Sequence, residues 1–287
     1  MTGRRGVVSP TVRRRRLGAE LRRYRETAGF TIDQVAEHMG CSASKISRLE
    51  TGQIGSSPHD VREILTLLGV GESDVYELVE VAKETRDRGW WQRHGVVLTS
   101  SFVAFEQAAT EIRSYEAQCV PGLVQTKEYA RALIAGGGQL DDEPKTPEHI
   151  ESRLHVRMHR RMLLTQDDPV QFWCVIDEAA LLRPVGGHGA MRRQLEHLTT
   201  VSKMDNVTLQ VLPLQAGAHP GMDGSFALLR FPHDSDPDTV YVSMATGGMF
   251  QERAEDLSRY TLIFDALTRL ALTPDDSTAL MQTMAKE

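Results

Sequence analysis

Residues 17–52 read LGAELRRYRETAGFTIDQVAEHMGCSASKISRLETG. Apolar residues recur at helical spacing in three successive runs, and each run is closed by a glycine. Only Gly40, Cys41 and Ser42 separate the second run from the third, and a glycine can take the left-handed backbone that reverses a chain so quickly. Ala36 is small enough for two helices to cross at it. This spacing predicts a helix-turn-helix.

The third run would be the helix that reads bases. Ser42 is a good N-cap, so Ala43, Ser44 and Lys45 would form the first turn of this helix. In this class of motif, that end of the helix enters the major groove. Lys45 is favoured for a base, while Arg48 is left open between a base and a phosphate. Thr31 would cap the preceding helix, whose first amides suit a phosphate. The expected DNA-binding residues are Thr31, Ser42, Ala43, Ser44, Lys45, Ser47 and Arg48, and phosphate contacts are expected from Arg13, Arg14, Arg15, Arg16 and Arg22.

Charge is divided unevenly along the chain. Residues 1–70 carry 12 Lys and Arg against 7 acidic residues, a net +5, whereas residues 71–287 carry a net −11. A basic head on an acidic body indicates that only the head meets a polyanion. Within the head, Glu50 is expected to be structural and to pair with an arginine of the first helix, such as Arg22 or Arg23.

The remainder of the 287 residues predicts a second, mixed domain. Residues 102–119 are ambiguous between a helix and a hairpin, with a strand favoured over 111–118. Strands are expected at 170–176, 207–212, 225–231 and 239–243, and helices at 127–134, 148–164, 191–204, 252–272 and from Thr273-Pro274 onward. The fold class is therefore α+β, with an all-α N-terminal domain of five helices and a C-terminal domain of helices around a small β-sheet. The expected boundaries are a disordered arm at 1–12, the helix-turn-helix domain at 13–86, a hinge at 87–98 and the C-terminal domain at 99–287.

No catalytic or cofactor motif stands out. The three cysteines lack C-x-x-C spacing, and no G-x-S-x-G, Walker or G-x-G-x-x-G pattern occurs. His155 and His159 have a spacing that can bind zinc, but the arginines around them favour a solvated basic face. Asp177-Glu178 is explained as the N-cap and first-turn acid of a helix. We expect no enzyme, no metal and no cofactor, but a domain that senses a ligand or partner, with Gln125, Thr126 and His219 as candidate residues.

Two resemblances add to this reading. Residues 17–52 closely resemble the Cro/phage-repressor (XRE-type) helix-turn-helix family. The C-terminal domain resembles that of actinobacterial regulators called WhiJ-like or Scr1-family antitoxin-like. It departs from them at Val124, where a second Leu is usual, and at Arg161, where Gln is frequent. The segments that carry this second resemblance are VPGLVQTKEYARAL (120–133), VIDEAALLRPVGG (175–187), VTLQVLPLQAGAHPGMDGSFALLRF (207–231) and YTLIFDALTRLAL (260–272).

The second resemblance implies a regulator of development or secondary metabolism, often encoded beside a short partner protein. Two functions stay open: a DNA-binding regulator modulated by a ligand or partner, and an antitoxin-type protein that neutralises a neighbouring small protein and autoregulates its operon. Either would act in the cytoplasm, on the nucleoid and without a membrane, as a homodimer on double-stranded DNA with two half-sites. The helix at residues 257–270, with an inner face of Leu257, Tyr260, Ile263, Phe264, Leu267 and Leu270, would lie at the dimer interface or pack on its own sheet.

Overall fold

The computed structural model describes residues 10–52, 54–84, 100–137, 146–232, 236–244 and 247–286. The chain divides between Trp90 and Trp91 into two compact units, the N-terminal and the C-terminal domain. The expected hinge at 87–98 and residues 1–9 of the expected arm lie outside the described residues. The first helix begins at Pro10, so residues 10–12 are helical rather than part of an arm. Proline suits a helix start because its missing N–H would have no partner there.

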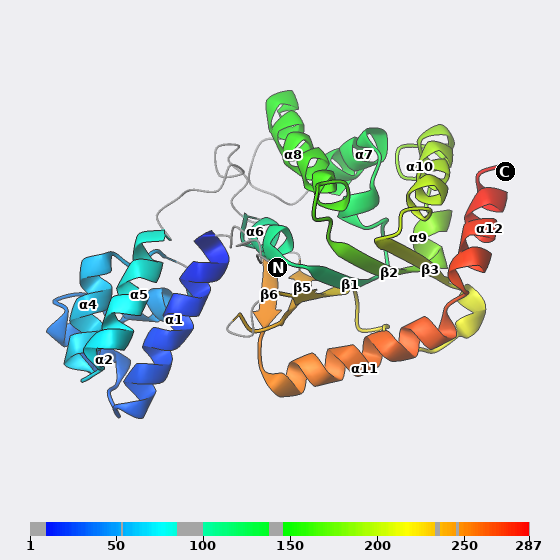
Figure 1. The fold of residues 1–287 in the computed structure, drawn as a ribbon. Helices are drawn as coiled ribbons and strands as arrows, with labels where there is room; N and C mark the ends of the chain where they lie inside the picture. The colour runs from blue at the N-terminus through cyan, green and yellow to red at the C-terminus, as the bar shows by residue number, and fades with distance from the viewer. Residues whose placement is uncertain are drawn as a thin grey trace. The chain divides into compact units, whose positions relative to one another are not determined.

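The described part of the N-terminal domain is a bundle of five helices, coloured blue to cyan in Figure 1. Leu17, Ile46 and Leu49 are at most 1% exposed and lie in one shared core. Gly40, with a φ of +58°, makes the predicted reversal between the second and third helices. The helices are α1 (Pro10–Thr27), α2 (Ile32–His38), α3 (Ala43–Glu50), α4 (Pro58–Leu67) and α5 (Glu72–Glu84).

A glycine allows α1 to approach α3 closely. A Cβ atom at Gly18 would lie 2.5 Å from the Leu49 carbonyl oxygen and 2.6 Å from that of Glu50. Any larger residue would therefore push the two helices apart. Ala36, which is 4% exposed in the core, is the correspondingly small residue of α2.

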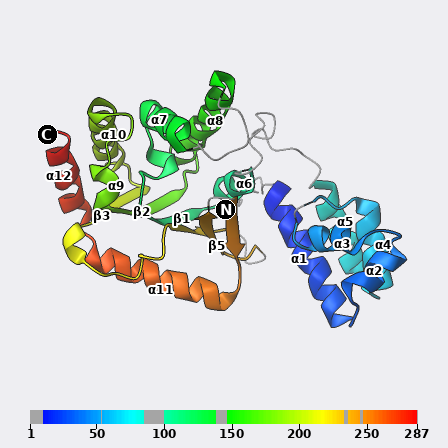
Figure 2. The same ribbon diagram turned by 180° about the vertical axis from the view of Figure 1, so that it is seen from behind.

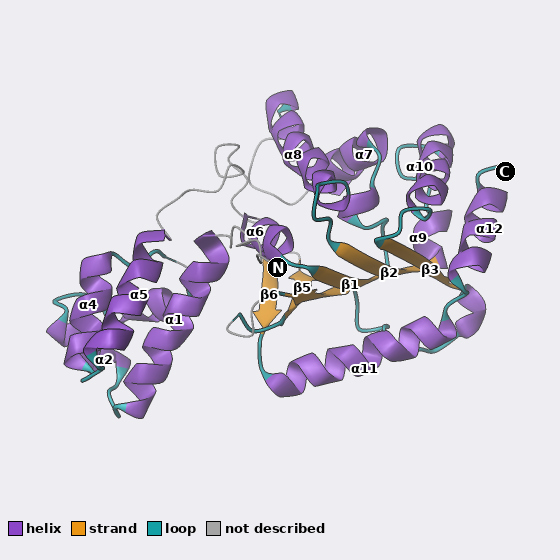
Figure 3. Cartoon of the chain, viewed as in Figure 1, coloured by secondary structure: helices purple, strands orange, loops and turns teal. Residues whose placement is uncertain are grey.

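The C-terminal domain is built on a six-stranded mixed sheet with the order β3-β2-β1-β4-β5-β6, drawn in orange in Figure 3. The first three strands are parallel, and the last three continue antiparallel from β1. The strand favoured over 111–118 is confirmed, and a helix precedes it. The strands are β1 (Glu111–Glu116), β2 (Gln171–Asp177), β3 (Val207–Leu212), β4 (Phe226–Arg230), β5 (Thr239–Met244) and β6 (Gly247–Gln251), the last of which was not predicted.

Helices cover both faces of this sheet. In Figures 1 and 2, α11 (Ala254–Leu270) lies on one face, and the helices that connect the parallel strands lie on the other. Two right-handed crossovers that step in the same direction place their helices on the same face. These connecting helices are α7 (Lys127–Gly137), α8 (Pro147–Arg160), α9 (Glu178–Leu182) and α10 (His188–Val201), and α6 (Ser100–Ala108) and α12 (Pro274–Met284) complete the set.

The inner face of α11 packs on its own sheet. Phe264 and Leu267 are fully buried there, and Leu257, Tyr260 and Ile263 pack partly buried beside them. The prediction was wrong at Leu270, which is 44% exposed. The alternating three- and four-residue spacing 257, 260, 264, 267 continues at residue 271 and not at 270, because a helix turns once in 3.6 residues.

Candidate functional site

Side-chain caps fix the starts of α2 and α3. Thr31 Oγ1 accepts a hydrogen bond from the Gln34 amide at 3.2 Å, and the Gln34 side chain accepts one from the Thr31 amide at 2.8 Å. Ser42 Oγ accepts from the Lys45 amide at 3.2 Å. Both predicted N-caps are confirmed. Each cap satisfies an amide of the first turn, which leaves the remaining first-turn amides for a phosphate.

The open face of α3 carries small and polar side chains. Ser44, Ser47 and Arg48 are exposed, and Ala43 is half-buried beside them. Residues three or four apart lie on the same side of a helix, so these four share one surface. Arg48 Nε donates to the Ser44 carbonyl at 3.2 Å, which lays the guanidinium back along the helix. The expected base-reading residues of α3 are thus brought together, with Lys45 at their flank.

Lys45 reaches from α3 to α4. Its Nζ lies 3.5 Å from Asp60 Oδ2, and the two side chains are 39% and 23% exposed. The Asp60 amide donates to Ser57 Oγ at 3.0 Å, so the helix start that carries this carboxylate is fixed. A half-exposed pair at this distance contributes little stability, so Asp60 holds Lys45 only weakly.

The arginines at 14–16 lie on α1, where consecutive residues point about 100° apart, so they spread around the helix. The side chain of Arg13 lies outside the described residues. Burial lowers the pKa of Arg14. The backbone of Arg15 packs on Gly52, where a Cβ atom would lie 2.7 Å from Arg15 Cα. Arg22 is exposed and pairs with Glu26 at 2.7 Å.

Glu50 is buried in an ion pair as predicted, but with another residue. Arg25 Nε and Nη2 donate to its two carboxylate oxygens at 2.6 and 2.9 Å, and both side chains are at most 10% exposed. These hydrogen bonds raise the pKa of Arg25. The expected partner, an arginine of the first helix, is confirmed. It is Arg25 and not one of the two examples, because Arg22 and Arg23 are exposed, whereas Arg25 follows the buried Leu21 by four residues.

A hydrogen-bonded turn after β1 contains two of the expected ligand residues. The Thr126 amide donates to Gln194 Oε1 at 2.6 Å, and Gln125 Nε2 donates to the Val120 carbonyl at 2.6 Å. Gln125 is 1% exposed, and its Oε1 accepts from Arg157 Nη1 at 3.1 Å. Both residues therefore hold the turn in place, and Gln125 also orients Arg157.

An ion pair joins α6 to α8 beside this turn. Arg160 Nε and Nη2 donate to the two carboxylate oxygens of Glu106 at 2.5 and 2.7 Å. The Arg160 guanidinium also lies 5.3 Å from the centroid of the Phe102 ring. A Cβ atom at Gly122 would lie 3.0 Å from Arg160 Nη2, so a glycine at 122 leaves room for this pair. Both charges are enclosed and satisfied.

Glu116 and Arg157 lie close to this pair, but among the described residues neither has an ion-pair partner within 4 Å. Both are half-buried. Burial raises the pKa of Glu116 to about 7, although Ser225, Arg160 and Arg157 oppose the rise. Burial, and next the charge of Arg160, lower the pKa of Arg157 to about 10. The prediction of a solvated basic face on α8 was wrong for Arg157 and Arg160, which face acidic residues in the interior.

His219 lies in a separate cluster on the α11 side of the sheet. Tyr115, which packs against that side, donates its hydroxyl to Asp177 Oδ2 at 3.0 Å. His219 Nε2 is 3.8 Å from the same oxygen, and its Nδ1 accepts from the Gly221 amide at 3.2 Å. Gln125 bonds to α8 on the other face, so the structure does not bring the three expected ligand residues together.

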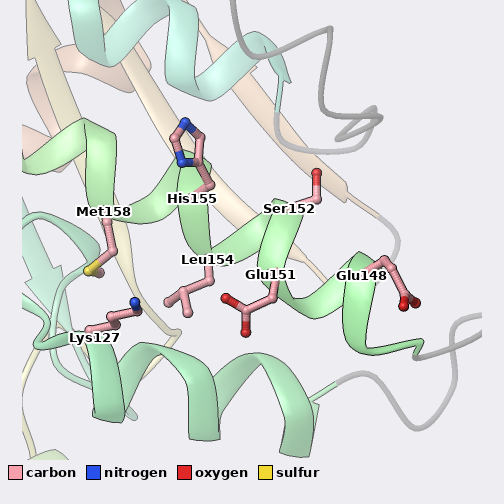
Figure 4. A pocket seen from close by; sticks show the side chains of 7 residues that line it. All are labelled: Lys127, Glu148, Glu151, Ser152, Leu154, His155 and Met158. Atoms are coloured by element: carbon pink, nitrogen blue, oxygen red, sulfur yellow. The ribbon is translucent and has the colours of Figure 1, made fainter.

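An open hollow of about 610 Å³ lies between α7 and α8. In Figure 4, Lys127, Glu151 and Leu154 point into the space between the two helices. The described residues contain no group of three His, Cys, Asp or Glu side chains able to hold a metal ion. Among all the helices that the structure describes, none has both the length and the apolar character of a membrane span.

Residues 16–78 match a family described as a helix-turn-helix domain, in agreement with the caps and the turn of α2 and α3. The N-terminal domain is therefore of the kind that transcription regulators use to bind DNA. Neither a curated protein nor a solved structure matches the chain. Residues 99–283, more than half of the chain and the whole of the sheet, match the family described as a domain of unknown function (DUF5753). The chain therefore belongs to the DUF5753 family and has a helix-turn-helix domain in its N-terminal part.

Proposed function

We propose that this chain is a transcription regulator in which α3 reads a specific operator and the C-terminal domain modulates DNA binding in response to a small ligand or a partner protein. The observation that carries the reading role is the open face of α3, where Ser44, Ser47 and Arg48 are exposed. Short side chains permit close approach to base edges, and an arginine can bind guanine with two hydrogen bonds. As a regulator of this kind, the chain would catalyse no reaction. The resemblance to WhiJ-like regulators supports a place in development or secondary metabolism.

The proposed form on DNA is a homodimer over two half-sites about one helical turn apart, because one short α3 reads too few base pairs for a unique site. The N-terminal helices already bury their apolar stripes against one another, so the dimer contact is assigned to the C-terminal domain. The outer side of α11, where Leu262 is 67% exposed, is open for it. Sedimentation of the full chain and of residues 1–86 and 88–287 tests this. A dimeric 1–86 with a monomeric 88–287 contradicts it.

Selection from a random pool of duplex DNA tests the reading role. We expect one recovered motif with repeated halves, and an affinity whose logarithm falls linearly with the logarithm of the salt concentration. Ser44→Ala should cost about 1–3 kcal/mol of binding free energy if Ser44 contacts a base, and should relax the preference at one position. Ser73→Ala on α5, also exposed, is the matched control and should change neither quantity. Recovery of no motif, or an unchanged preference in Ser44→Ala, would refute the placement of α3.

A further inference from the structure

In the described part of the C-terminal domain, two glutamates and two arginines lie near one another between the sheet and its helices. Glu106 comes from α6, Glu116 from β1, and Arg157 and Arg160 from α8. Glu116 points away from α11, because its neighbour Tyr115 packs on that side and alternate residues of a strand point to opposite faces. Charges inside a domain cost free energy unless each has a partner. Whether each of these four side chains has a partner therefore indicates whether it stabilises the fold or is available to a ligand.

Two of the four are paired and two are not. Arg160 and Glu106 satisfy each other through two hydrogen bonds. Arg157 makes one, to Gln125 Oε1, although a guanidinium has five N–H donors. Among the described residues, no carboxylate lies within 4 Å of Arg157 and no cation within 4 Å of Glu116. One arginine and one glutamate are thus held near each other with unused bonding capacity.

The surroundings hold these two groups in fixed positions. Gln125, which orients Arg157, is itself bonded to the Val120 carbonyl at 2.6 Å. Ser225, the neighbour of Glu116, accepts from the Ala117 amide at 3.0 Å. Side chains that are set in place before binding cost a ligand little reorganisation.

The position in the sheet is one that ligands use. Glu116 is the last residue of β1, at the carboxyl end of a parallel strand whose neighbour β2 follows the α7–α8 connection. Ligands of sheets with such connections bind in the crevice outside the carboxyl ends of the strands. Glu116 and Arg157 remain half-buried, whereas Glu106 and Gln125 are at most 2% exposed, so solvent reaches both unpaired groups.

From this geometry we infer that Glu116 and Arg157 form a binding site for a small zwitterion, an amino acid or a close derivative. The Arg157 guanidinium binds its carboxylate through two parallel hydrogen bonds, and Glu116 accepts from its ammonium group. Each group then gains an ion-pair partner at hydrogen-bonding distance, which none of the described residues gives it. This inference rests on the proposed function in that the zwitterion would be the signal that changes DNA affinity.

Thermal unfolding and calorimetric titration of the full chain test the site. The probes are the twenty standard L-amino acids, each at millimolar concentration, with sodium acetate and methylammonium chloride as half-ligands at equal ionic strength. At least one amino acid should raise the Tm saturably, and both half-ligands should bind weakly or not at all. Binding of none of the twenty, or an effect of acetate equal to that of the best amino acid, would overturn the inference.

Arg157→Met and Glu116→Gln should each weaken the binding of that amino acid by about tenfold or more, since a fixed charge partner is lost. Arg192→Met, which changes an exposed arginine of α10, is the control and should bind as the wild type does. Without the amino acid, Arg157→Met should keep or raise the Tm, because an unpaired buried cation becomes an apolar chain. If that variant does not fold, the wild-type titration still decides. DNA selection without zwitterion binding would refute only this site, and binding without DNA selection would refute only the regulatory function.

Discussion

Each domain encloses an arginine and a glutamate that hydrogen-bond to each other, and the C-terminal domain also holds a second arginine and glutamate that do not. In the N-terminal domain, Arg25 makes two hydrogen bonds to Glu50 and a third to the Phe30 carbonyl at 2.9 Å. In the C-terminal domain, Glu116 and Arg157 lie near each other without such bonds. Arg25 and Glu50, the closed pair, join two helices, and their hydrogen-bonding groups are already used. Glu116 and Arg157, the open pair, stabilise their domain less and can still bind another molecule.

The two domains also differ in the part of their structure that would bind another molecule. The N-terminal domain closes its interior and turns exposed polar side chains of α3 outward, which suits a flat and charged partner such as duplex DNA. The C-terminal domain keeps its unpaired charges at the carboxyl end of β1, which suits a small molecule that enters the fold. Variants of these ion pairs, from the most to the least stabilising, test this difference between the domains.

The largest effect is expected from opening the closed pair. Arg25→Met leaves Glu50 charged and buried without a partner, which should cost about 3–5 kcal/mol of unfolding free energy. Hydrogen exchange of peptides from α1 to α3 measures the loss in the full chain. Arg22→Met removes an exposed pair, 60% open on the arginine side, and should cost less than about 0.5 kcal/mol. Equal losses in the two variants would show that the Arg25 pair is not the one that joins α1 to α3.

The second effect concerns pH and the open pair. Burial raises the pKa of Glu116 from 4.5 to about 7, so between these values the folded chain keeps a proton that the unfolded chain releases. The free energy of unfolding should therefore fall as pH rises from about 4.5 to 7, by at most about 3 kcal/mol, and change no further through Glu116 above that range.

Glu116→Gln should remove this part of the pH dependence. Urea unfolding of both proteins at pH 5 and pH 8 gives the difference directly. The wild type should lose more stability than the variant between the two values. An equal loss would mean that Glu116 ionises in the folded chain as it does in the unfolded one.

The N-terminal domain could be predicted from sequence because its signals are local. A capping serine or threonine, a small residue at a crossing and a glycine at a reversal each act within a few residues, as Thr31, Ala36 and Gly40 show. The same holds for the caps Asp177 and Thr273 in the C-terminal domain. Strand β6, GGMFQ, has no local signal, because its two glycines disfavour a strand that pairing with β5 then imposes.

The open pair could not be predicted, because a charged residue is expected at the surface unless something shows otherwise. One partial signal exists. Arg157 follows Leu154 by three residues and precedes Leu164 by seven, so it lies on the buried stripe of α8 and its continuation. That stripe does not show which acid Arg157 would meet. Only the packing of α8 against the sheet brings it near the end of β1, and this arrangement is not local in the sequence.

An intermediate loss of stability is expected when a larger side chain is placed at the helix crossing of α2 in the N-terminal domain. Ala36→Leu adds three carbon atoms to a core position that is 4% exposed and should cost about 1–3 kcal/mol of unfolding free energy. Ala19→Leu, on the exposed side of α1, adds the same atoms and should be nearly neutral. Hydrogen exchange of α2 and α3 peptides compares the two. Similar exchange in both variants would mean that α2 can shift to accommodate the larger side chain.

The smallest effect is expected at Lys45 and Asp60, which form a long and partly exposed ion pair. The two side chains are 3.5 Å apart and partly exposed, so the ion pair should contribute less than about 1 kcal/mol of free energy. DNA must offset this free energy before Lys45 can reach a base or a phosphate. Asp60→Asn should therefore tighten operator binding by up to that amount. Glu63→Gln removes the same charge from α4, but Glu63 lies 3.5 Å from His59 rather than beside Lys45. Anisotropy titrations at two salt concentrations should show a gain in Asp60→Asn beyond that in Glu63→Gln. Equal gains would mean that the overall charge of α4, and not the contact with Lys45, sets the affinity.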